Sequence, residues 1–119
     1  MNDVTPDELM RRIDAQLSHV WMVRAFIKHS EEAAEDDELA EVQRTLYDYM
    51  LALGGPWKAG DAAAYIKQAR KKFPKLRRAA QKFAEIQPEI STHTNFQMAV
   101  TSVKLAVDEI GRLLGIAAD

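Results

Sequence analysis

Apolar residues recur every three or four positions along most of this chain, a spacing that is typical of amphipathic α-helices. Four segments carry the pattern, and glycines and prolines separate them. No segment alternates apolar and polar residues with the β-branched side chains that strands favour. The residues expected to be buried, segment by segment, are Leu9, Ile13, Leu17, Val20 and Ile27; Leu39, Val42, Leu46, Tyr49, Met50 and Leu53; Tyr65, Ala69, Phe73, Leu76, Ala80 and Phe83; and Phe96, Val100, Val103, Val107, Ile110 and Leu114.

Capping residues predict the ends of the first two helices. The segment Thr5–Glu8 combines an N-cap threonine, a first-turn proline and a capping-box glutamate, so a helix is expected from Thr5 to about Ser30. The second helix is expected to begin near residues 36–37, where acidic side chains favour the positive end of the helix dipole. It is expected to end at Gly54–Gly55, because glycine tolerates the left-handed conformation that terminates helices.

The third helix is expected to run from about Asp61 to Gln87, and it contains a proline in its interior. Pro74 lacks a backbone N–H and its ring clashes with the preceding turn, so the sequence predicts a kink or a short break there. The apolar pattern keeps its phase across Pro74, which favours one kinked helix over two separate ones.

The last helix is expected to start after Pro88, with Ser91 or Thr92 as its N-cap, and to end at about Gly115. Short turns join the four helices, so consecutive helices are expected to lie antiparallel. The predicted fold is therefore all-α: an up-down four-helix bundle in which residues 1–119 form a single domain.

Composition narrows the classes of protein to which this chain can belong. Its 119 residues are 47% hydrophobic and 29% charged, proportions that are ordinary for a globular domain. There is no cysteine, which excludes disulfides, thiolate metal sites and cysteine nucleophiles. We see no signal peptide and no apolar run of the ~20 residues that span a membrane, so we expect a cytoplasmic protein without a membrane partner.

Charge is separated into two blocks of opposite sign, although the net charge is only −2. Positions 31–41, around the junction of the first two predicted helices, hold seven acidic residues and no basic one. Positions 67–82, in the third helix, hold eight basic residues and no acidic one. The contact surface expected on that helix comprises Lys67, Arg70, Lys71, Lys75, Arg78 and Lys82.

Three roles are compatible with the basic helix. It could bind the phosphates of a nucleic acid, dock against the acidic block of the same or a neighbouring molecule, or face solvent. The sequence pI of 5.9 and the lack of helix-turn-helix spacing count against nucleic acid. We therefore favour the acidic block or solvent, and we keep nucleic-acid binding as the alternative.

Arg24 is the candidate ligand residue whose position is hardest to explain. At 100° per residue it lies on the core side of the first helix, where an unpaired guanidinium is costly. It is either an anchor for a ligand or phosphate, or a residue whose charge reaches water or an interior partner while its stem lies on apolar surface.

Arg24 and His29 together form an R-x4-H pattern, which resembles the motif of the HEPN group of small helical ribonucleases. The resemblance covers these two residues, and it implies a ribonuclease in which they flank a scissile phosphate across a dimer. The chain departs from the HEPN pattern because Ala25, rather than a polar residue, follows the arginine, and because the motif ends the first helix instead of opening a late one. A HEPN-like ribonuclease is the third hypothesis.

Other motifs predict neither catalysis nor a metal or cofactor. The chain has no Glu-x-x-His motif of bundle di-metal sites and no glycine-rich phosphate loop. His19 and His93 belong to no evident base–nucleophile pair. Trp57, in the turn before the basic helix, is a further ligand candidate: it either stacks on a base or partner, or folds back to close the end of the bundle.

The first and last helices carry apolar residues away from their buried stripes. These are Met22 and Phe26 on the first helix, and Met98 and Leu105 on the last. A helix that is apolar on two sides is usually buried on two sides, so we expect a twofold homodimer through these helices. The predicted function is a non-enzymatic helical interaction protein, with the acidic junction and the basic helix as contact surfaces.

Overall fold

The computed structural model describes residues 4–118, and within that range it is helical without any strand. The prediction of an all-α fold is confirmed. Five helices are present rather than the four expected: α1 (Pro6–Lys28), α2 (Glu31–Glu35), α3 (Asp37–Ala59), α4 (Ala62–Ile90) and α5 (Thr94–Leu113).

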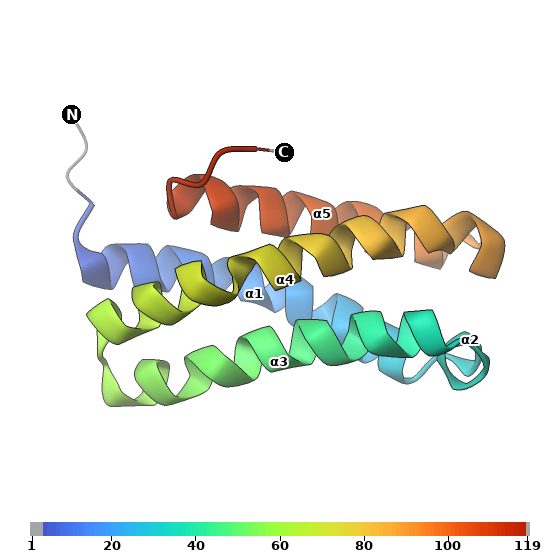
Figure 1. The fold of residues 1–119 in the computed structure, drawn as a ribbon, viewed down its shortest axis with the longest axis horizontal. Helices are drawn as coiled ribbons and strands as arrows, with labels where there is room; N and C mark the ends of the chain where they lie inside the picture. Colours follow the sequence, from blue (N-terminus) through green and yellow to red (C-terminus); the bar gives the residue numbers. More distant parts are fainter. Residues whose placement is uncertain (1–3, 119) are drawn as a thin grey trace.

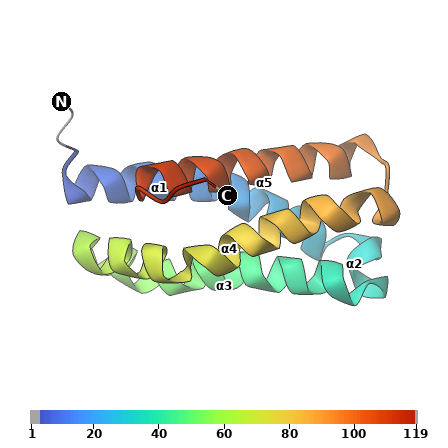
Figure 2. The ribbon, with the colours of Figure 1, turned by 45° about the horizontal axis from the view of Figure 1, so that its top comes forward.

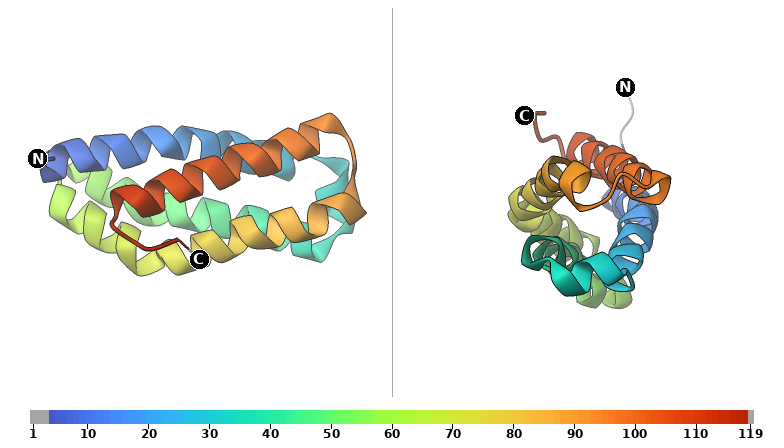
Figure 3. Two further views of the ribbon diagram at one scale, coloured as in Figure 1. Left: turned by 90° about the horizontal axis from the view of Figure 1, so that it is seen from above. Right: turned by 90° about the vertical axis from the view of Figure 1, so that its right-hand side faces the viewer.

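The four long helices lie side by side and run back and forth along the longest dimension of the molecule, which measures 43 × 28 × 20 Å (Figures 1 and 2). Seen end-on in Figure 3, they form a ring in which α1 neighbours α3 and α5, and α4 completes the ring between those two. The α1–α5 face and the α3–α4 face are therefore on opposite sides of the molecule. The short helix α2 lies at one end, between α1 and α3.

The core is one continuous cluster that receives side chains from all four long helices. Leu46 of α3, Phe83 of α4 and Val103 of α5 are fully buried in it, together with Ile13 of α1. Each apolar stripe read from the sequence faces this interior, although Leu9, Met50 and Val100, which were expected to be buried, are only partly buried. Burying such side chains supplies most of the free energy that holds the helices together.

The predicted end of the second helix is wrong. α3 continues through Gly54–Gly55 and Pro56 to Ala59, and the residue with the left-handed conformation is Gly60, at φ 64°. Glycine can end a helix but does not have to do so, and α3 continues beyond Leu53, its last buried residue, to Ala59. Asp61 then caps α4, with its Oδ1 accepting the N–H of Ala64 at 3.0 Å.

The predicted start of the last helix is also wrong by one or two residues. α4 runs through Pro88 to Ile90, and His93, not Ser91 or Thr92, is the N-cap of α5. The His93 Nδ1 accepts the N–H of Asn95 at 3.0 Å, which satisfies a backbone donor that the first turn leaves open.

The basic helix α4 is uninterrupted at Pro74, so the structure contains one helix there and not two. The apolar pattern on both sides of Pro74 predicted this continuity. A bend at Pro74 stays a prediction.

α4 and α5 approach closely at a glycine. A Cβ added at Gly111 would lie 2.9 Å from Cζ of the buried Phe73 ring, whereas one added at Gly54 would meet nothing within 4 Å. We expect Gly111→Ala to lower the free energy of unfolding by about 1–2 kcal/mol through overpacking, and Gly54→Ala to raise it by about 0.5–1 kcal/mol through helix propensity. Urea unfolding of both variants measures these changes, and changes of the same sign would contradict the close packing at Gly111.

Candidate functional site

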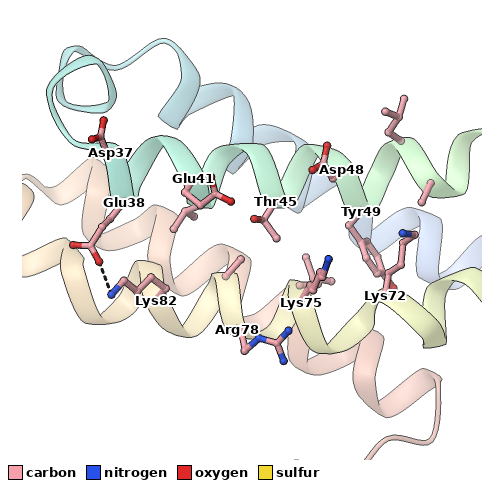
Figure 4. Close-up of a pocket in the computed structure, with 15 residues that line it drawn as sticks. Asp37, Glu38, Glu41, Thr45, Asp48, Tyr49, Lys72, Lys75, Arg78 and Lys82 are labelled. Carbon is pink, nitrogen blue, oxygen red and sulfur yellow. Dashed lines mark ion pairs between the residues drawn. The ribbon is translucent and has the colours of Figure 1, made fainter.

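The charged face of the molecule is a groove of about 820 Å³ between α3 and α4 (Figure 4). The acidic residues on its α3 wall are Asp37, Glu38, Glu41 and Asp48, and the basic residues on its α4 wall are Lys72, Lys75, Arg78 and Lys82. Parts of Val42, Tyr49, Leu76 and Ala79 line it between the walls. The two charge blocks of the sequence therefore face each other, in part, within one molecule.

An ion pair crosses this groove at one end. Lys82 Nζ lies 2.5 Å from Glu38 Oε2, and the hydrogen bond to Glu38 raises the pKa of Lys82 (Figure 4). Both side chains are substantially exposed, so the pair contributes little to stability. Its consequence is electrostatic, because an acidic wall beside the basic one weakens the attraction of the groove for a polyanion.

The predicted basic stripe is divided in the structure. Lys75, Arg78 and Lys82 line the groove, while Arg70 turns toward α5, where its Nε donates to the carbonyl oxygen of Leu114 at 3.2 Å. Arg77, in the same basic block, donates through Nη1 to the carbonyl oxygen of Ala117 at 2.9 Å. The remaining members of the predicted stripe, Lys67 and Lys71, are exposed outside the groove lining. Two of the eight basic residues thus hold the segment that follows α5.

The acidic block also has a capping role. Asp36 caps α3, since its Oδ1 accepts the N–H of Leu39 at 2.9 Å. Ser30 caps α2 in the same way, with its Oγ accepting the N–H of Ala33 at 3.2 Å. The acidic residues of these first turns stabilise the helices by lying at the positive end of each helix dipole.

The opposite face, formed by α1 and α5, is free of charge over part of its length, whereas Arg12 of α1 and Glu109 of α5 lie near each other elsewhere on it. Residues 15–23 of α1 and residues 90–103, which lead into and form most of α5, include no Lys, Arg, Asp or Glu. Met22, Met98 and Leu105 are 61–67% exposed on these two helices. Phe26 is half-buried and meets Phe96 edge-on, with ring centres 4.9 Å apart. We call Met22, Phe26, Met98 and Leu105 the α1–α5 apolar face.

Arg24 occupies the seam between α1 and α3 and is only 8% exposed. Its Nε donates to Oε1 of Gln43 at 3.1 Å. Its Cζ lies over two aromatic rings, 4.7 Å from the centre of Trp21 and 4.6 Å from the centre of Tyr47. We call Trp21, Arg24, Gln43 and Tyr47 the Arg24 cluster. The sequence placed Arg24 on the core side but did not reveal Gln43 or Tyr47, although their i, i+4 spacing puts both on one side of α3.

The structure does not bring Arg24 and His29 together in one site. Arg24 is buried between helices, whereas His29 is the exposed C-cap of α1, with its backbone N–H bonded to the carbonyl oxygen of Ala25. Trp57, the third ligand candidate, is partly exposed near the end of α3, and its ring centre lies 6.2 Å from that of Tyr65.

Two buried tyrosines carry hydroxyl groups whose partners the sequence did not suggest. The Tyr49 hydroxyl donates to the carbonyl oxygen of Ala69, and the Tyr65 hydroxyl donates to Oδ1 of Asp14, both at 3.0 Å. Burial raises the pKa of Tyr49 and of Tyr65 above 10, and the negative charge of Asp14 adds to the effect at Tyr65. Burial also raises the pKa of Asp14, although its hydrogen bond with Tyr65 partly opposes this. Both hydrogen bonds satisfy buried hydroxyl groups and so stabilise the fold.

Among the residues described, no group of three or more His, Asp or Glu side chains is placed to hold a metal ion. Over the same range, no helix combines the length and apolar composition needed to cross a bilayer. Comparison with known proteins finds no family model, no curated protein and no solved structure that matches this chain.

Proposed function

We propose that this protein is a non-enzymatic helical interaction protein, built as a single up-down four-helix bundle, which acts as a homodimer through its α1–α5 apolar face. The observation that supports this most directly is that the part of this face formed by residues 15–23 and 90–103, which include no charged residue, presents Met22 and Met98 to solvent, with the exposed Leu105 next to it. Depletion of charge and enrichment in methionine and aromatic residues are typical of the centres of protein interfaces.

A second copy fits this face better than an unrelated surface does. In a twofold dimer the same patch meets itself, and an uncharged patch brings no like charges together when it does so. α1 and α5 have 23 and 20 residues, so their shared face measures about 30 Å by 20 Å. This size is comparable with the ~800 Å² that each partner contributes to an interface of standard size.

The charged groove between α3 and α4 stays accessible in such a dimer, and we propose it as the second contact surface, where a protein partner would meet both walls. Lys75, Arg78 and Lys82 supply the basic wall. A nucleic acid would have to approach the acidic wall as well, so we do not favour that alternative.

Sedimentation velocity over a range of concentrations tests the dimer. We expect Leu105→Glu to weaken association about a hundredfold or more, because the twofold axis places two unpaired carboxylates in the interface. Leu51→Glu is the matched control, since Leu51 is the same residue type, is 63% exposed compared with 64% for Leu105, and lies on α3. A native protein that stays monomeric at high concentration, or a dimer that both variants weaken equally, would rule out this interface.

A further inference from the structure

Arg24 is a buried cation without a counter-ion. Arg24 is more than nine-tenths buried, and no other charged side chain in residues 4–118 is buried to that extent. No carboxylate in the same range forms an ion pair with it. Buried charges are normally paired, because removing an ion from water is costly. Its hydrogen bond to Gln43 and its two aromatic contacts offset part of this cost but leave the charge uncompensated.

The Arg24 guanidinium has N–H donors other than Nε that form no hydrogen bond within residues 4–118. Its hydrogen bond to Gln43 uses Nε and leaves Nη1 and Nη2 without a partner in the described part of the chain. Neither Nη group is fully buried, although Arg24 as a whole is only 8% exposed, so the two groups lie just beneath the protein surface. The cluster therefore holds a guanidinium in one orientation, with two adjacent Nη groups that bond to nothing in residues 4–118 and lie next to the surface.

We infer that the Arg24 cluster is a binding site for a carboxylate from an acidic segment of a partner protein. A guanidinium whose two Nη groups are free binds the two oxygens of a carboxylate in parallel, and such bidentate pairs are strong because donor and acceptor are both charged. Gln43 and the two rings fix the rotamer before binding, which lowers the entropy cost of forming the pair.

The surroundings of Arg24 favour a protein segment. Trp21 and Tyr47 are 47% and 36% exposed, so their rings can contact apolar groups beside the carboxylate. Trp, Tyr and Arg are also the residues that most often dominate the energy of protein interfaces. Lys28, one turn after Arg24 on α1, adds one positive charge, which suits a carboxylate better than a nucleic-acid strand that draws on many cations.

This site goes beyond the proposed dimer and is separate from it. The Arg24 cluster lies on the α1–α3 seam, whereas the apolar face lies on the α1–α5 side. The site therefore stands if the protein proves to be a monomer, and the dimer stands if the site proves empty.

A peptide titration followed by ¹H–¹⁵N NMR tests the inference on the whole 119-residue chain. The probe is acetyl-Leu-Glu-Glu-Leu-amide, and acetyl-Leu-Gln-Gln-Leu-amide is the matched neutral peptide. We expect the glutamate peptide to shift the Arg24 Nε–H and Trp21 indole signals while the Trp57 indole signal stays in place, and the glutamine peptide to shift none of them at the same concentration. Equal shifts at Trp57, or equal shifts with both peptides, would overturn the site.

Arg24→Lys keeps the positive charge but removes the paired Nη1 and Nη2 donors of the guanidinium. We expect it to weaken binding of the glutamate peptide about tenfold. Arg44→Lys is the matched control, because Arg44 is an exposed arginine of α3 that pairs with Glu41, and it should leave binding unchanged. If Arg24→Lys does not fold, the two-peptide comparison on the unmodified protein decides the question by itself.

Acetate that reproduces the shifts supports a carboxylate site, whereas inorganic phosphate that binds more tightly than the glutamate peptide would overturn that assignment.

Discussion

Raising the pH from 10 to 12 is expected to lower the free energy of unfolding by roughly 5 kcal/mol through Tyr49 and Tyr65. In the unfolded chain both phenols lose their protons near pH 10. In the folded protein burial raises the pKa of each, so both stay protonated at a pH where the unfolded chain has already ionised. The unfolded state thus binds fewer protons, and stability falls by about 1.4 kcal/mol per pH unit for each tyrosine above pH 10.

Urea unfolding at pH values between 9 and 12 measures this loss. A variant with Tyr49→Phe and Tyr65→Phe should lose the tyrosine part of the slope, although it starts from a lower stability because the hydrogen bonds to Ala69 and Asp14 are gone. Tyr47→Phe is the control, since it keeps both buried hydroxyls. Lysines also titrate in this range, so the difference between native and double-variant slopes is the decisive quantity, and equal slopes would contradict the prediction.

Leu46→Ala is expected to lower the free energy of unfolding by about 3–4 kcal/mol. Leu46 is fully buried in the cluster where α1, α3, α4 and α5 meet, so the substitution removes apolar contacts and leaves a cavity that the surrounding helices fill only in part. A loss of this size is a large fraction of the 5–15 kcal/mol that typically stabilises a domain.

Leu51→Ala provides the comparison within the same helix. Leu51 lies five residues after Leu46 on α3 but is largely exposed, so the same chemical change should alter stability by less than about 0.5 kcal/mol. Urea denaturation of both variants gives the two values. Similar losses in both would mean that the buried and exposed sides of α3 are assigned wrongly.

The interior of this fold could be predicted from the sequence because it depends on helical phase. Leu46, Phe83 and Val103 each lie on the apolar stripe predicted for their helix, and all three are buried in the same core cluster. Helix ends were less predictable. Gly54–Gly55 is a common stop signal, but α3 continues through it to Ala59, because a glycine pair permits a helix end without requiring one.

The candidate site was also predictable only in part. The phase of α1 correctly placed Arg24 toward the core, yet its partners Gln43 and Tyr47 come from α3, and a sequence does not fix how two helices are rotated against each other. The sequence marked the basic side of α4 and offered the acidic block of the same molecule as one of its possible partners, but for the same reason it did not show that Arg70 would bind the carbonyl oxygen of Leu114.

The α1–α5 apolar face and the α3–α4 groove lie on opposite sides of the ring of helices (Figure 3). This arrangement determines where the grooves would lie in a dimer. Two copies joined back to back through the apolar face would point their grooves away from each other, giving a bivalent particle. A partner that carries two matching segments could then be held by both grooves at once, and the second attachment would gain avidity from the high local concentration that the first creates.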